Sequence, residues 1–140
     1  MASQHIDIKK LYRIIDANFN RAKEGLRVCE DICRFFLNGK EATKKYKEAR
    51  HRLTAIVSSL PVFQIIQARD IQRDVGKASI AQEFKRESVS DIFYANSQRV
   101  KESLRVLEEL TKLINDRLAY DLKQLRYQIY ALEKEIAKKC

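Results

Sequence analysis

The sequence predicts an all-α protein built from four long helices in a bundle. Only three of its 140 residues are glycine and one is proline, far below the average usage of about 7% and 5%. Hydrophobic residues make up 45% of the chain and charged residues 34%, a balance typical of long amphipathic helices. This composition argues against a turn-rich β-sandwich, a glycine-loop nucleotide fold and a disordered chain. A chain of this length fits one domain, residues 1–140.

The first two helices are bounded by the few helix-breaking residues in the amino-terminal half. A helical pattern begins near Asp7 and continues to Leu37, where Asn38-Gly39 supplies a C-terminal stop. A second helix covers about residues 41–60, and Pro61 ends it. The expected order is therefore a long helix followed by a shorter one.

The last two helices are bounded in the same way. The third begins near Ser88 or Ser90, each a suitable N-cap, and continues to about Ile114. Asn115-Asp116 makes the next turn and caps the fourth helix, which continues to about Lys138. Both of these helices are long.

One motif occurs twice, in the first and the third helix, with nine identical residues at a constant offset of 78. The two copies read Ala17-Asn18-x-x-Arg21-x-Lys23-Glu24-x-Leu26-Arg27-Val28-x-Glu30 and Ala95-Asn96-x-x-Arg99-x-Lys101-Glu102-x-Leu104-Arg105-Val106-x-Glu108. A fainter match, at an offset of 76, pairs Lys47-x-x-Arg50 with Lys123-x-x-Arg126. A duplicated helical hairpin explains both matches and predicts a four-helix bundle with approximate two-fold symmetry. Its halves are about residues 7–60 and 88–138, joined by a long crossover loop at 61–87.

The repeated motif places polar residues on an apolar helix face. At about 100° per residue, Asn18 lies near the centre of the apolar stripe, Arg21 at its edge and Glu24 beyond it. The second copy repeats this arrangement with Asn96, Arg99 and Glu102. Because a buried amide and a neighbouring guanidinium both need partners, two interpretations are open. Either the two sets converge in one polar pocket, or they satisfy each other, with Arg21 paired to Glu24 or Glu102 and Asn18 bonded to Asn96.

The crossover loop is a second candidate site, and it also contains a predicted short helix at Val62–Gln67. Residues 68–77 hold several charged side chains and a glycine, namely Arg69, Asp70, Arg73, Asp74, Gly76 and Lys77. Arginine and lysine bind phosphate oxygens, and aspartate binds Mg²⁺. The segment therefore suits a magnesium–phosphate group, although a solvated loop with surface ion pairs has the same composition.

The net charge of +9 favours an anionic partner, such as a phosphorylated small molecule, nucleic acid or an acidic membrane. We expect no membrane contact, because no apolar run approaches the roughly 20 residues that a span needs. The chain start lacks the apolar region of a secretory signal, which indicates a cytoplasmic protein. Cys29 and Cys33 fall on the apolar stripe, where core thiols are expected rather than metal ligands.

A basic helical module that binds nucleic acid or a protein is a competing interpretation. Its function would be carried by cations on outward helix faces, namely Arg27, Arg34, Arg105 and Lys112. The same faces are expected to carry acids, namely Glu30, Asp31, Glu108 and Glu109. These acids argue against nucleic acid as the partner.

Three motifs in order carry a family resemblance. They are the repeated Ala-Asn-x-x-Arg-x-x-Glu-x-Leu-Arg-Val-x-Glu, the loop Ala68-Arg69-Asp70-x-x-x-Asp74-x-Gly76, and Arg126-Tyr127-x-x-Tyr130-x-Leu132-Glu133. Over about residues 10–136 the chain resembles the small helical domain at the N-terminus of some bacterial thiamine-phosphate synthases, which also exists alone as a hydroxymethylpyrimidine-phosphate kinase. Because the chain ends where a fused synthase barrel would begin, it resembles the stand-alone form.

The resemblance implies that ATP, with Mg²⁺, phosphorylates 4-amino-5-hydroxymethyl-2-methylpyrimidine phosphate to the diphosphate used in thiamine biosynthesis. On this interpretation Arg21 and Arg99 clamp phosphate, while Arg69 and Arg73 close over the phosphates from the loop. Asp70 and Asp74 would take Mg²⁺. The remaining candidates for substrate binding are Asn18, Asn96, Glu24, Glu102, Arg126 and Tyr127.

The loop departs from the usual family pattern, which reads more like Ala-Arg-Asp-Thr-x-Gly-Asp followed by Gly-Thr. Here Ile71 and Lys77 stand for the two threonines, and Arg73 stands for the first glycine. These changes remove hydroxyls and a glycine suited to a backbone phosphate nest, and add cations. They leave open a third interpretation, a pyrimidine-phosphate-binding or regulatory domain without catalysis. The sequence also leaves open whether the site lies within one chain or across a homodimer.

Overall fold

The computed structural model describes residues 6–79 and 84–140 and confirms the all-α fold, with no strand among those residues. Its helices are α1 (Ile8–Asp31), α2 (Lys40–Val57), α3 (Val62–Gln67), α4 (Val89–Thr111) and α5 (Asp116–Ala137), with a π-helical turn at Ile32–Phe36 directly after α1. The bounds agree closely with those expected from the sequence. Residues 80–83 of the predicted crossover loop lie outside the described residues.

The helix ends follow from the capping residues that the sequence offers. Ser88, rather than Ser90, caps α4, because its hydroxyl accepts a hydrogen bond from the Asp91 backbone N–H at 3.1 Å. The Asn115 side chain accepts from the Arg117 N–H at 2.9 Å and caps α5. Asn38 adopts a left-handed conformation, with φ of 50°, after the π-helical turn and stops the first helical segment as expected.

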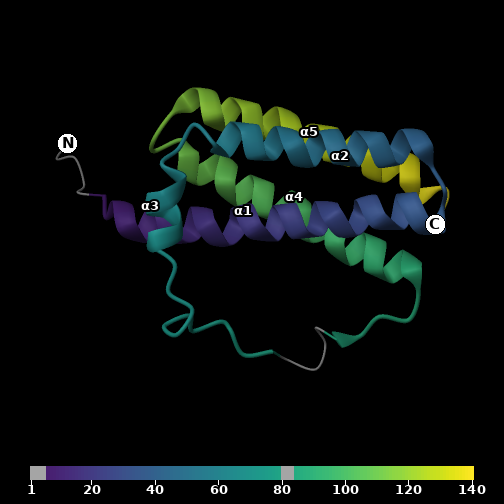
Figure 1. The fold of residues 1–140 in the computed structure, drawn as a ribbon, viewed down its shortest axis with the longest axis horizontal. Coiled ribbons are helices and arrows are strands. Elements are labelled where there is room, and N and C mark those ends of the chain that lie inside the picture. Colours follow the sequence, from purple (N-terminus) through teal and green to yellow (C-terminus); the bar gives the residue numbers. More distant parts are fainter. Residues whose placement is uncertain (1–5, 80–83) are drawn as a thin grey trace.

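The four long helices pack in antiparallel pairs (Figure 1). Helix α2 returns along α1, and α5 returns along α4. Two contacts between α2 and α5 fix their antiparallel register: Lys45 Nζ lies 3.2 Å from a Glu135 carboxylate oxygen, and Arg52 donates to the Gln128 side-chain oxygen at 2.9 Å. The crossover carries the chain from α3 to the far end of α1, so that α4 also runs antiparallel to α1 (Figure 1).

The core between these helices is apolar, with Tyr46 and Phe93 as its largest buried rings. Two acids lie in it as well, since Glu30 and Glu108 are 2% and 4% exposed. This corrects the expectation that both acids lie on outward faces. Helical periodicity does not show that an arginine from the next helix contacts each carboxylate. These contacts make the burial of the two acids possible. No helix in the described part of the chain is both long enough and apolar enough to cross a membrane.

Helices α1 and α4 cross at Gly25. A Cβ atom at this position would lie 2.6 Å from Val100 Cγ2 and 3.1 Å from the Asn96 carbonyl oxygen. No side chain fits such a gap without movement, because Val100 is itself fully buried and β-branched. Glycine is thus required here by close helix approach.

Replacing Gly25 with alanine should destabilise the protein. Overpacking costs about 1–3 kcal/mol and outweighs the gain in helix propensity of about 1 kcal/mol; Gly25→Val should cost more still. Urea unfolding measures the difference, with Gly76→Ala as control, because the nearest atom to a Cβ there is a flexible carboxylate oxygen at 3.5 Å. A Gly25→Ala variant as stable as the parent protein would show that the helices separate here at no cost.

Candidate functional site

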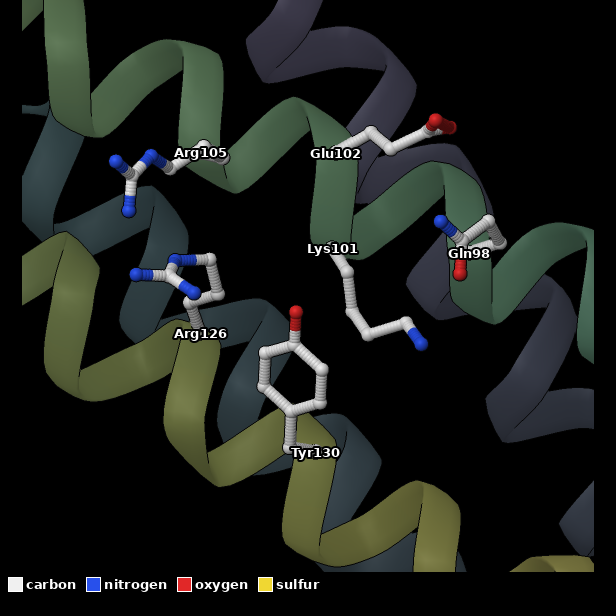
Figure 2. Close-up of a pocket in the computed structure, with 6 residues that line it drawn as sticks. All are labelled: Gln98, Lys101, Glu102, Arg105, Arg126 and Tyr130. Carbon is white, nitrogen blue, oxygen red and sulfur yellow. The ribbon is translucent and has the colours of Figure 1, made fainter.

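A cleft of about 420 Å³ lies between α4 and α5. It is lined by Gln98, Lys101, Glu102, Arg105, Arg126 and Tyr130 (Figure 2). Arg126 and Tyr130 extend from α5 toward α4, and Lys101 extends from α4 toward α5. Glu102 points away from α5 (Figure 2). The cleft thus has cations and an aromatic ring as its inner side chains.

Each cation of the cleft is held by an acid. Arg126 donates from Nε and Nη2 to one Glu108 oxygen, both at 3.2 Å, while Arg105 Nη1 lies 3.4 Å from the other oxygen. The side chain of Arg126 is only 9% exposed, whereas that of Arg105 is 56% exposed. One buried carboxylate therefore positions two guanidinium groups.

Arg126 stays charged in this setting. Its burial opposes the positive charge, but the hydrogen bonds with Glu108 and Tyr130 outweigh that effect and raise the pKa of the guanidinium above its ordinary value. The Arg126 Cζ atom lies 5.2 Å from the ring centroid of Tyr127 and 6.0 Å from that of Tyr130, within cation–π range. Tyr127 contacts Arg126 in this way, and it is Tyr130 that lines the cleft.

The first half of the bundle has a matching acid–arginine cluster. Glu30, which corresponds to Glu108, accepts from Arg50 Nε at 3.1 Å and from Arg27 Nη1 at 3.4 Å. The repeated arginine and glutamate of the motif therefore make the same contacts in both copies. The two-fold symmetry of the whole bundle stays a prediction.

The two asparagines of the motif do not bond to each other. Asn18 donates to the Ile14 carbonyl oxygen and Asn96 to that of Ile92, each at 2.9 Å and each within its own helix. Asn18 is buried, and Asn96 is half-buried. The donor half of each amide is thus satisfied locally, and the proposed bond between the copies is absent.

The charged residues that accompany these asparagines in the repeated motif lie at the surface. Arg21, Arg99, Glu24 and Glu102 are all exposed. Arg21 is one turn before Gly25, and Arg99 precedes Val100, so both arginines are close to the α1–α4 crossing along their helices. The ion pairs that the described residues make include neither arginine, which leaves both available to an anion.

The crossover loop is tied to the first turns of α1. Arg69 binds Asp16 through two hydrogen bonds of 2.7 Å, from Nε and Nη2 to the two carboxylate oxygens, and this raises the pKa of Arg69. Arg13 Nη2 donates to the Asp70 carbonyl oxygen at 2.9 Å. The bidentate geometry is the strong form of an arginine–carboxylate pair. These bonds hold the start of the loop against α1.

The acids predicted to bind metal lie in the same loop. Asp70 accepts from the Arg73 backbone N–H at 3.1 Å, and its other oxygen lies 3.6 Å from Arg73 Nε; Asp74 accepts from the Gly76 N–H at 2.9 Å. Within residues 6–79 and 84–140, no three His, Cys, Asp or Glu side chains form a metal-binding group. Mg²⁺ normally binds one or two carboxylates together with substrate phosphates and water. The binding of Mg²⁺ by Asp70 and Asp74 stays a prediction.

Cys29 and Cys33 are buried free thiols, as expected for core residues. Burial raises the pKa of Cys29 to about 12 and that of Cys33 to about 11, so both stay protonated at neutral pH.

Sequence reasoning did not select several residues that build these sites. They are Gln98 and Lys101 in the cleft and Asp16 beneath the loop. Arg105 was a candidate for nucleic acid, and Tyr130 was part of the third family motif. Lys101 and Arg105 belong to the repeated motif, which was the available signal for the cleft. Asp16 gave no signal, because its partner Arg69 is 53 residues away.

Comparison with known proteins gives a consistent result. A family model described as the ThiD2 family matches residues 13–135. Similar curated proteins are named thiamine-phosphate synthase: that of Nostoc punctiforme is 41% identical over 127 residues, or 90% of this chain and 35% of that protein. The Synechocystis protein is 45% identical over 124 residues (86% and 34%), and that of Rhodopirellula baltica 38% identical over 129 residues (91% and 34%). The chain spans about a third of the length of these relatives, and no solved structure matches it.

Proposed function

We propose that this chain, which belongs to the ThiD2 family, transfers a phosphoryl group from MgATP to 4-amino-5-hydroxymethyl-2-methylpyrimidine phosphate. The product is the pyrimidine diphosphate, and the pathway is thiamine biosynthesis. The family match over residues 13–135 carries the proposal. The names of the similar thiamine-phosphate synthases support the pathway.

The reaction joins two anionic substrates. An oxygen of the pyrimidine phosphate forms a bond to the γ-phosphorus of ATP, the bond from that phosphorus to the bridging oxygen breaks, and ADP leaves with the electron pair. Such a transfer needs positioning and charge neutralisation rather than covalent help from the protein. Mg²⁺, when bound, would neutralise phosphate charge.

The phosphate clamps in this proposal are Arg21 and Arg99. Both are exposed, and both flank the α1–α4 crossing from opposite helices. A guanidinium binds phosphate oxygens through two parallel hydrogen bonds. Glu24 and Glu102, one turn farther along each helix, would orient the clamps. The Asn96 amide oxygen, half-buried nearby, would accept from the pyrimidine amino group, with Asn18 in the matching position.

The crossover loop supplies the rest of the proposed site. Arg69 and Arg73 would approach the phosphates, and Asp70 and Asp74 would hold Mg²⁺. The hydrogen bonds from Arg69 to Asp16 leave Nη1 of Arg69 for a phosphate oxygen. The loop cations that replace the usual family residues, Arg73 and Lys77, add charge at the same place.

The binding of nucleic acid receives less support. Among its candidate cations, Arg27 is paired with Glu30, and Arg105 and Lys112 are both paired with Glu109. Paired cations release fewer counterions on binding a phosphate backbone than free ones do.

Turnover with MgATP and the pyrimidine phosphate tests the proposal, with ADP and the pyrimidine diphosphate as readouts. Arg21→Ala should lower kcat/KM by on the order of 10²-fold, because it removes a preorganised cation from the transferring charge. Arg34→Ala is the matched control, since Arg34 is an exposed cation outside the proposed site. Folding of each variant is checked by circular dichroism.

No phosphorylation by the parent protein would contradict the kinase assignment. If the pyrimidine phosphate still raised the Tm of the parent protein and not that of Arg21→Ala, the chain would be a binding or regulatory domain. Salt-sensitive binding of nucleic acid as the sole activity, lost in an Arg27→Ala/Arg105→Ala variant, would favour the basic module instead.

A further inference from the structure

We infer that the α4–α5 cleft is the site for the nucleotide, with its phosphate groups against Arg105 and Arg126 and its base against the ring of Tyr130. This inference rests on the proposed function, because the proposed reaction requires a nucleotide donor and leaves its position unassigned. The ligand that this cleft would bind is a polyphosphate joined to an aromatic base.

The first argument is the difference between the two halves of the bundle. Both halves keep the buried glutamate with its two arginines. At the offset of 76, however, the second half has Tyr130 and Glu133 where the first half has Thr54 and Val57. The tyrosine and the acid are therefore not needed for the shared packing. Tyr130 lines the cleft, and Glu133 binds Lys101, which also lines it.

The second argument concerns Lys101, which these extra residues position. Its Nζ donates to a Glu133 oxygen at 2.7 Å and lies 5.0 Å from the Tyr130 ring centroid. The corresponding Lys23 of the first half lies 5.5 Å from the ring of Phe19, on its own helix. Of these two lysines, only Lys101 lies near an aromatic ring of a different helix. One N–H of Lys101 is used by Glu133, and two more remain for a ligand.

The third argument is the state of the two arginines. Glu108 engages Nε and Nη2 of Arg126, while Arg105 is held by Glu108 at 3.4 Å and by Glu109 at 3.1 Å. Figure 2 shows the two guanidinium groups on opposite walls, with the Arg126 group directed toward Arg105. Two cations fixed by a shared acid form a preorganised pair of donors, and a phosphate oxygen between them completes their hydrogen bonding.

The fourth argument is the space available. The volume of about 420 Å³ lies within the range of about 300–1,000 Å³ found for small-molecule sites. Tyr130 is 45% exposed, so part of its ring is open to stacking. The mixture of ring face, cations and the Gln98 amide suits a nucleotide better than it suits phosphate alone.

The position of the cleft relative to Arg99 follows from the order of residues along α4. Glu102 lines the cleft and follows Arg99 by three residues, which is one turn of α4. The cleft is thus contiguous with the helix surface that carries Arg99.

The test measures binding of MgADP, magnesium tripolyphosphate and adenosine to the full chain by titration calorimetry. Tyr130→Ala should weaken MgADP and adenosine about tenfold, because it removes the stacking surface, and should leave tripolyphosphate unchanged. Arg105→Ala should weaken MgADP and tripolyphosphate about tenfold, because it removes a charged donor. The matched controls are Tyr120→Ala, a tyrosine of α5 that is 56% exposed, and Arg117→Ala, which is paired with Asp121 as Arg105 is with Glu109.

The outcomes separate this inference from the proposed function. MgADP binding that is unchanged in both cleft variants overturns the assignment of the cleft, even if the protein turns over substrate. Absence of turnover, with MgADP binding that is weakened in the cleft variants and not in the controls, supports the cleft and contradicts the kinase. MgADP binding lost only in Arg21→Ala would place the nucleotide at the α1–α4 crossing and overturn the inference.

Discussion

Replacing Glu108 with alanine should lower the free energy of unfolding by roughly 3–5 kcal/mol, because it leaves the buried Arg126 guanidinium without its carboxylate. The side chains of Glu108 and Arg126 are 5% and 9% exposed, so water cannot replace the lost partner. The matching change in the first half, Glu30→Ala, should also be strongly destabilising. Its partner Arg50 is 12% exposed, so a somewhat smaller loss is expected. Urea unfolding followed by circular dichroism measures both.

Glu109→Ala is the matched control for Glu108→Ala. It removes the neighbouring acid, which also contacts Arg105 but is 44% exposed, and should cost no more than about 1 kcal/mol. A double variant, Glu108→Leu/Arg126→Leu, removes both charges and should regain much of the lost stability. Equal losses for Glu108→Ala and Glu109→Ala would show that the Arg126 guanidinium finds water or another acid.

The sequence was sufficient for the helices because local signals determine their bounds. Ser88 and Asn115 accept hydrogen bonds from backbone N–H groups two or three residues later, and Asn38 takes the left-handed conformation that stops a helix. Each of these interactions lies within a few residues of the chain. With one proline and three glycines in the chain, few other positions competed for helix ends.

Side-chain partners were predicted less well, because they depend on contacts between helices. The helical periodicity of the sequence placed Glu30 on an outward face, because periodicity within one helix does not show that Arg50 extends from α2 to cover that face. Helical periodicity also placed Asn18 at the centre of the apolar stripe, and the residue is indeed buried there. It did not predict the hydrogen bond from the Asn18 side chain to the Ile14 carbonyl oxygen, which satisfies the amide donor. The periodicity of one helix shows which face is buried and not what meets it.

The repeated motif contains two pairs of equivalent arginines that differ in their contacts. Its arginine and second glutamate, Arg27–Glu30 and Arg105–Glu108, contact each other in both halves and serve the packing of the bundle. The other arginines, Arg21 and Arg99, are exposed and make no contribution of that kind. A duplicated motif thus contains a part that packs the helices and a part that is free for ligands. We expect replacement of Glu30 or Glu108 to act on stability and replacement of Arg21 or Arg99 to act on activity, while Arg105 belongs to the packing part and also lines the cleft.

Asp16→Ala should lower the proposed kinase activity by on the order of 10²-fold, since it releases a loop that positions reacting groups, and small misplacements have effects of this size. Asp16 binds Arg69 through two hydrogen bonds of 2.7 Å, and these join α1 to the crossover over 53 residues of sequence. Hydrogen exchange gives a readout independent of activity: the amides of residues 69–77 should exchange faster in the variant. Arg86→Ala, which removes an exposed cation from the crossover outside this segment, should change neither quantity.

Comparison with Arg69→Ala separates a positioning role from phosphate contact. Both variants break the same pair, and both should accelerate exchange in residues 69–77. If Arg69 also binds phosphate through Nη1, its replacement should lower kcat/KM about tenfold further than Asp16→Ala does, the usual scale for a lost charged hydrogen bond. Equal losses, with no further loss in the double variant, would make Arg69 a positioning residue alone. In that case Arg21 and Arg99 would remain as the proposed phosphate clamps, and the loop would serve to bring Asp70 and Asp74 to them.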